Sequence, residues 1–190
     1  MKKIISTLLI SALLASSLTA CNNDGGSSVS GAGSSSNTDP ASNPGGENNN
    51  ADNSGIAYPD NRAGALAKAA LTTNTWPKMD LVSNANFIEV QFSSEFDLSK
   101  CEEYCFVTNM MSTQLNKVVI IKPAAGNEDA VQTAINNYLE SVKNNPDIAF
   151  YPAQQESAAG AVSGTTGDGY LYLIVHPNGS DIADAIKSAQ

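Results

Sequence analysis

The chain has 190 residues, with 19 acidic side chains against 10 basic ones, so its formal net charge is −9 at pH 7. This charge argues against nucleic-acid binding and against binding to anionic lipid through a polybasic segment, because both need a basic surface. Removal of residues 1–20 would take away two lysines and no acid, which moves the net charge to −11. The composition therefore predicts no nucleic-acid partner.

The first twenty residues have the pattern of an export signal. Lys2 and Lys3 supply a positive start, and the apolar run from Ile4 to Leu14 is too short to span a bilayer. Leu18–Cys21 (LTAC) resembles the bacterial lipobox, which implies cleavage before Cys21 and acyl chains on its reactive thiol. The alternative is an ordinary secretory signal in which Cys21 has no role. We expect a protein anchored in the cell membrane through Cys21 and facing outside the cytoplasm.

A linker is expected over residues 21–57. Asn, Gly and Ser make up 23 of the 36 residues after Cys21, and the only sizeable aliphatic side chains there are Val29 and Ile56. Such a segment buries too little apolar surface to offset the entropy of ordering it, so we expect a disordered spacer. Residues 58–190 are long enough for one domain of ordinary size.

Apolar periodicity predicts the elements of this domain in chain order. An Ala- and Leu-rich stretch indicates a first helix, alternation indicates a strand at 87–92, and β-branched residues indicate a strand at 118–121 that is buried on both faces. A stripe at helical spacing after Asn127 predicts the longest helix. The expected elements are helix Arg62–Thr72, strands Phe87–Phe92, Cys105–Met111 and Val118–Ile121, helix Asn127–Lys143, loop Asp147–Ala158, strands Ala161–Thr165 and Tyr170–Val175, and a last helix capped by Ser180.

This order predicts an α+β fold. We expect a single domain in which a mostly antiparallel sheet of about five strands packs with two to three helices. Residues 164–169 are rich in Gly, Thr and Asp, which is typical of a hairpin turn between the last two strands. They precede a strand and lack the lysine of a P-loop, so we do not interpret them as a phosphate loop.

The domain resembles DUF4358, a family of uncharacterised bacterial lipoproteins. The resemblance covers roughly residues 73–187 and rests on the order and spacing of short landmarks. These are Trp76–Met79 (WPKM), the long helix after Lys122, Tyr151–Pro152, and Gly169–Leu171 before the last strand. The resemblance implies an envelope address and this fold, and it implies no activity.

Cys101 and Cys105 are the two cysteines of the domain. Outside the cytoplasm such a pair suggests a disulfide, although residues four apart in a straight strand lie about 13 Å apart, beyond the reach of a disulfide. A turn before Cys105 would permit the bond, and free structural thiols are the alternative. A metal site completed by the only histidine, His176, is a weaker possibility. We predict no metal and no cofactor.

His176 lies at the end of the last expected strand. It could serve as a general base, but no G-x-S-x-G elbow is present to supply a nucleophile, and a local hydrogen-bonding role is the simpler interpretation. Four aromatic residues, Trp76, Tyr151, Tyr170 and Tyr172, could line a groove for a sugar or peptide, although aromatic residues in strands are more often core. Glu95, Asp97, Glu102 and Glu103 are acidic neighbours without the spacing of a calcium loop.

Three functions remain open from the sequence. The favoured hypothesis is a non-enzymatic envelope module that binds or scaffolds a protein, peptide or glycan. The alternatives are an envelope hydrolase with His176 as its base and a small solute-binding lipoprotein, although 133 residues is short for a two-lobed binding protein.

Overall fold

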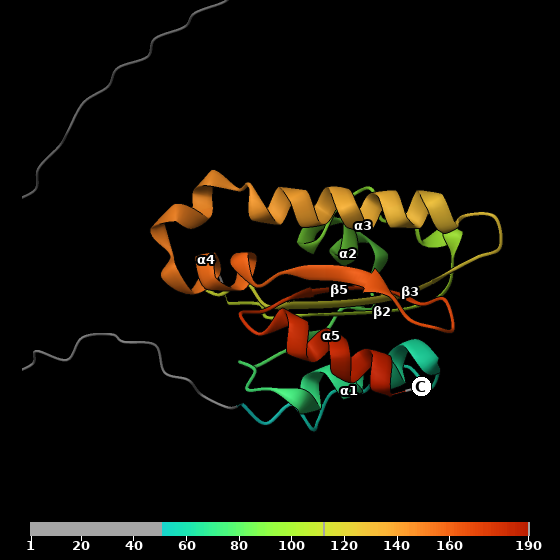
Figure 1. Ribbon diagram of the computed structural model, residues 1–190, viewed down its shortest axis with the longest axis horizontal. Helices are drawn as coiled ribbons and strands as arrows, with labels where there is room; N and C mark the ends of the chain where they lie inside the picture. The colour runs from blue at the N-terminus through green and yellow to red at the C-terminus, as the bar shows by residue number, and fades with distance from the viewer. Residues whose placement is uncertain (1–50, 112, 190) are drawn as a thin grey trace, which may run out of the picture. The chain divides into compact units, whose positions relative to one another are not determined.

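The structure is a computed structural model that describes residues 51–111 and 113–189. The expected signal peptide, Cys21 and the linker up to residue 50 lie outside the described residues. The described part is an α+β domain, as predicted, with one five-stranded sheet between two layers of helices (Figure 1). Its strands are β1 Asp80–Leu81, β2 Cys101–Thr108, β3 Lys117–Pro123, β4 Val162–Thr165 and β5 Leu171–Val175.

The sheet has the order β1-β2-β3-β5-β4, and each neighbouring pair is antiparallel. The expected hairpin between β4 and β5 is confirmed, with Val162 opposite Ile174 and Thr165 opposite Leu171. β3 lies in the middle, and its residues 118–121 are fully buried, as the β-branched run predicted. β1, a strand of two residues, forms one edge of the sheet.

Helices cover both faces of the sheet because its central strands are apolar on both sides. On one face, α1 (Arg62–Thr73) and α5 (Gly179–Ser188) pack on side chains that include Val118, Ile120 and Ile174. On the other face, α3 (Glu128–Lys143) packs with α2 (Ala85–Gln91) and α4 (Pro152–Ala159) over Val119, Ile121 and Leu173. Alternate side chains of β3 and β5 thus serve two cores.

The expected strand over Phe87–Phe92 is wrong, because most of this segment is helix α2. Asn84 caps the helix: its side-chain oxygen accepts hydrogen bonds from the backbone N–H groups of Asn86 and Phe87. Ile88 and Phe92, four residues apart, are the buried pair, while Val90 is 77% exposed. The apolar alternation at 88, 90 and 92 imitates a strand, but the burial follows helical spacing.

The expected loop over Asp147–Ala158 is also wrong. It contains a 3₁₀ helix, Pro146–Phe150, followed by α4, in which Pro152 takes the first position that tolerates proline. The described part of the chain therefore holds five α-helices where two or three were expected, and α2 and α4 account for the difference. The last helix is capped by Asn178, and Ser180 lies within its first turn.

The described residues include a short segment before the expected boundary at Tyr58. Residues 51–58, here called the arm, run beside residues 76–79: Asn53 donates to the carbonyl of Pro77 at 3.0 Å and accepts from the N–H of Met79 at 2.9 Å. Ile56 and Tyr58 pack against the core under α1. Among the described residues, no helix has the length and apolar character needed to cross a membrane.

Candidate functional site: a groove along the edge strand

A groove of about 370 Å³ runs along β1. It is lined by the chain from Asp80 to Asn84 and by two large apolar side chains, Phe87 of α2 and Met110 of the loop after β2, which we call its walls. Phe87 and Met110 are about half exposed, at 50% and 47%. We call this feature the edge groove. It combines an open strand edge with apolar side chains, which is a combination suited to binding a peptide.

Helix α2 holds Phe87 in place through contacts at both of its ends. Asn84 caps the N-terminal end, as described above. At the C-terminal end, the ammonium of Lys117 donates to the backbone carbonyl of Gln91 and lies 4.3 Å from the ring centroid of Phe92. A cation is favoured there because helix carbonyls point toward that end.

Lys117 is itself unusual, because it is a buried cation with 6% of its surface exposed. Its second hydrogen bond goes to the hydroxyl of Thr108, at 3.3 Å, and no carboxylate of the described residues forms an ion pair with it. Burial lowers the pKa of Lys117 from 10.5 to about 8. Burial of this ammonium group costs free energy, and its contact with α2 helps to offset that cost.

Asn109 fixes the loop that carries Met110, the second wall of the groove. Its amide nitrogen donates to the carbonyl of Lys78 at 2.7 Å, and its amide oxygen accepts from the N–H of Met111 at 2.9 Å. These two bonds attach the loop after β2 to the chain just before β1, which sets Met110 beside the groove. No feature of the sequence analysis pointed to Asn109 or Lys117, since the contacts join segments far apart in the chain.

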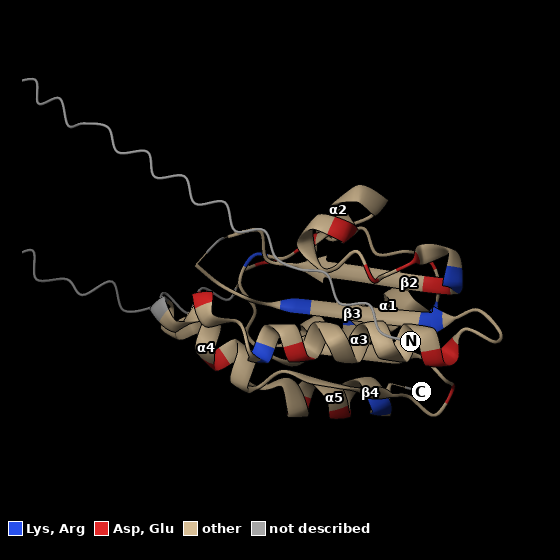
Figure 2. Cartoon of the chain, turned by 90° about the horizontal axis from the view of Figure 1, so that it is seen from above, with Lys and Arg blue, Asp and Glu red and all other residues tan. Residues whose placement is uncertain are grey.

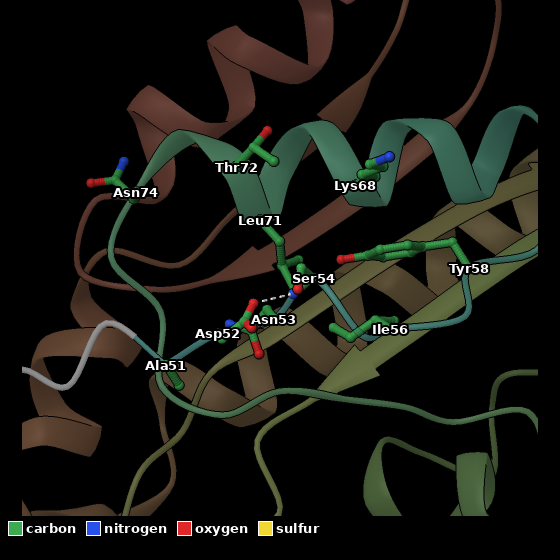
Figure 3. A pocket seen from close by; sticks show the side chains of 10 residues that line it. All are labelled: Ala51, Asp52, Asn53, Ser54, Ile56, Tyr58, Lys68, Leu71, Thr72 and Asn74. Atoms are coloured by element: carbon green, nitrogen blue, oxygen red, sulfur yellow. Dashed lines mark hydrogen bonds between the residues drawn. The ribbon is translucent and has the colours of Figure 1, made fainter.

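A second pocket, of about 600 Å³, lies between the arm and α1 (Figure 3). Tyr58 from the arm and Leu71 from α1 line it, and burial raises the pKa of Tyr58 to about 12. Its polar groups already serve the fold: Asn53 bonds residues 77 and 79, and the Asp52 carboxylate accepts from the N–H of Ser54. We interpret this pocket as the place where the arm docks.

His176 is buried at the end of β5 and is engaged at both ring nitrogens. Nδ1 accepts from the N–H of Asn178 at 3.0 Å, so Nε2 carries the proton and donates to the carbonyl of Thr75 at 3.1 Å. The ring lies 4.3 Å from that of Trp76, and burial lowers the pKa of His176. These two hydrogen bonds correspond to the local role that the sequence suggested for His176. They leave no ring nitrogen free to act as a base.

His176 also borders a small cavity of about 130 Å³, together with Ser157 and Gln114. The side-chain oxygen of Gln114 is buried and has no hydrogen-bond partner among the described residues. Because the imidazole is occupied on both sides, the cavity does not bring together a base and a nucleophile.

Cys101 and Cys105 are both free thiols in the structure. The sheet register shifts between Cys101 and Glu103, so this bulge turns the two cysteines to opposite faces. Cys105 is buried under α1, whereas Cys101 packs toward the α3 side. Burial raises the pKa of Cys101 to about 11 and that of Cys105 to about 12, which makes both unreactive.

The four aromatic residues considered for a ligand groove do not come together in one. Trp76, Tyr170 and Tyr172 are buried in the core beneath α1 and α5. Tyr172 lies across the ladder from Gly164, and any Cβ at that glycine would meet its ring. Tyr151, at the start of α4, is 44% exposed and belongs to neither wall of the edge groove.

The acidic residues that were considered for a calcium site also take part in separate contacts. Glu103 accepts from the Tyr170 hydroxyl at 2.9 Å and from the N–H of Ala63 at 3.1 Å, which joins the sheet to α1. Asp97 caps a 3₁₀ turn, and Glu95 accepts from the side chain of Asn137 on α3. Across the described ranges, no three His, Cys, Asp or Glu side chains gather in a way that could hold a metal ion.

Part of the chain matches a known protein family. Residues 89–176 match the family described as Domain of unknown function (DUF4358), over a stretch that holds β2 to β5 together with α3 and α4. β1 and Phe87, which form much of the edge groove, precede the matched stretch. No curated protein and no solved structure matches the chain. The match confirms the resemblance drawn from the landmarks, and residues 89–176 form a DUF4358 domain.

Proposed function

We propose that this protein is a lipid-anchored, non-enzymatic binding module of the cell envelope, and that the edge groove holds its partner. One observation carries the proposal. Five large apolar side chains stand exposed in the described part of the chain, and four of them (Phe87, Val90, Met110 and Met111) belong to α2 or to the loop that forms the second wall. Apolar surface gathered in one place marks an interaction site more often than scattered residues do.

The state of the reactive side chains supports a binding role over the hydrolase alternative. His176 uses both ring nitrogens in bonds to the backbone, and the raised pKa values of Cys101 and Cys105 keep these thiols protonated at neutral pH. These groups help to build the domain. Binding through the edge groove needs none of them.

The lipid anchor rests on Leu18–Cys21, and it predicts the effect of changing that cysteine. We expect the Cys21→Ala protein to leave the membrane fraction, because without acyl chains nothing in the net charge of −11 that remains after removal of residues 1–20 would hold it on an anionic lipid surface. Fractionation and detergent phase partition of cells that express each form measure this. The matched control is Cys101→Ala, which should stay in the membrane fraction. Membrane retention of Cys21→Ala would contradict the lipid anchor.

Binding at the edge groove is tested by site-specific photo-crosslinking in cells. A benzophenone amino acid in place of Phe87 keeps an aromatic ring at the groove wall, and we expect it to give a discrete covalent adduct on irradiation. The control position is Asp184 on α5, because its side chain is 76% exposed. Helix α5 packs on β4 and β5, near the sheet edge opposite to β1. Equal adducts from both positions, or none from residue 87, would count against the edge groove as the binding site.

A further inference from the structure

The edge groove has free main-chain hydrogen-bonding groups as well as apolar walls. β1 pairs with β2 so that Asp80 faces Thr108 and Leu81 faces Val107, and the N–H of Val82 donates to the carbonyl of Phe106 at 2.8 Å. In an antiparallel pair the bonded residues alternate. The N–H and C=O of Leu81 therefore point away from β2, along the side where the groove runs.

The apolar walls fit one large side chain beside that edge. The groove measures about 370 Å³, and Phe87 and Met110 each leave about half of their surface uncovered. In an added strand, alternate side chains would point toward the same face. One of them can then lie between Phe87 and Met110, while its neighbours in sequence point to solvent.

The charge near the edge groove indicates which kind of peptide would bind there. Asp80 is an exposed acid that lines the groove. Helix α2 also carries an exposed acid, Glu89, which lies two residues from Phe87 and therefore on the other flank of the helix; Figure 2 shows an acidic position on α2. The nearby basic residue Lys78 directs its ammonium to the arm, 3.4 Å from the carbonyl of Asp52. A second copy of this chain would bring the same acids and a net charge of −9 to the edge, which is unfavourable. A segment with basic residues complements it.

We propose that the edge groove binds an extended, basic peptide segment of a partner protein as a sixth strand beside β1. The main chain of the segment pairs with Leu81, one large apolar side chain enters the space between Phe87 and Met110, and lysine or arginine residues of the segment complement the acidic charge of Asp80 and of the chain as a whole. This inference rests on the proposed function and specifies the mode of binding and the chemistry of the partner.

The probe is a fluorescent seven-residue peptide of alternating lysine and valine with a central phenylalanine, titrated with the mature protein and followed by anisotropy. We expect saturable binding that weakens with added salt. A version of the same sequence with N-methyl groups on the residues that face β1 lacks those main-chain donors, and should bind at least about tenfold more weakly. A version with glutamate in place of lysine should not bind.

Leu81 offers a matched pair of protein variants. Leu81→Pro removes the outward N–H and keeps the β1–β2 ladder, since proline is tolerated where the N–H faces solvent on an edge strand. Leu81→Ala shortens the side chain and keeps the N–H. We expect the proline variant to lose about tenfold in peptide affinity and the alanine variant to lose less than about threefold, with melting curves recorded for both.

The outcomes separate this inference from the proposed function. Equal affinity of the methylated and plain peptides would overturn strand addition even if Leu81→Pro fails to fold, because the peptide comparison uses the unchanged protein. Equal binding of the glutamate peptide would overturn the basic partner, and a protein dimer formed through β1 would overturn it in favour of a second copy. In each case a discrete adduct from residue 87 would still support binding at the groove.

Discussion

Replacement of Gly179 by alanine is expected to destabilise the folded domain by about 3 kcal/mol, at the upper end of the usual cost of overpacking. Gly179 begins α5, and a Cβ built there would come closer than 3.0 Å to the backbone carbonyl oxygen of Gly160, where α4 ends. Gly160 is equally restricted, since its own Cβ would meet the carbonyl oxygens of His176 and Pro177. Backbone atoms on both sides leave no flexible side chain that could move aside.

The sign of this effect is informative, because alanine in a helix is normally more stable than glycine by about 1 kcal/mol. To relieve the clash α5 would have to shift, and its Ile182 and Ile186 are completely buried. Urea unfolding of the mature protein measures the change. The control is Gly55→Ala in the arm, where nothing lies within 4 Å of the added methyl group. An unchanged or increased stability of Gly179→Ala would show that the contact between α4 and α5 is not as close as described.

The sequence predicted the central strands well because their burial leaves a direct mark. Val118–Ile121 is β-branched throughout since β3 lies between two cores, and Tyr170–Val175 is equally apolar for the same reason. The long helix after Asn127 was predicted from an apolar stripe that continues over several turns, where helical spacing is unambiguous, and the observed helix has 16 residues. These elements bury side chains at regular intervals, and such intervals can be recognised in the sequence.

Helix α2 and the edge groove were missed for two different physical reasons. Around so short a helix, Ile88, Val90 and Phe92 fit a period of two, while Ile88 and Phe92 alone fit a spacing of four, and only the cap at Asn84 favours the helix. The groove depends on contacts between distant segments: Asn109 bonds to residue 78, and Lys117 bonds to residue 91. No local pattern indicates such contacts. The candidate site therefore became visible only in the folded chain.

Lys117 is expected to make the stability of the protein rise with pH. Its pKa is lowered by burial from 10.5 to about 8, so between these values the unfolded chain binds a proton that the folded chain does not. Stability then increases with pH across this window, by up to about 3 kcal/mol if the whole displacement is realised. The raised pKa values of Cys101 and Cys105 act in the opposite direction, since folding keeps these thiols protonated as pH rises above about 9.

Comparison with Lys117→Met isolates the lysine, because the thiols contribute equally to both proteins. We expect the free energy of unfolding of the wild type, minus that of the variant, to increase from pH 7.5 to pH 10 in urea titrations. Lys68→Met, which removes an exposed lysine from α1, is the control and should show a constant difference. A difference that stays constant for Lys117→Met would mean that the ammonium is not buried against α2. Because Lys117 joins β3 to the carbonyl of Gln91, such a result would also remove the contact that fixes the Phe87 wall of the edge groove.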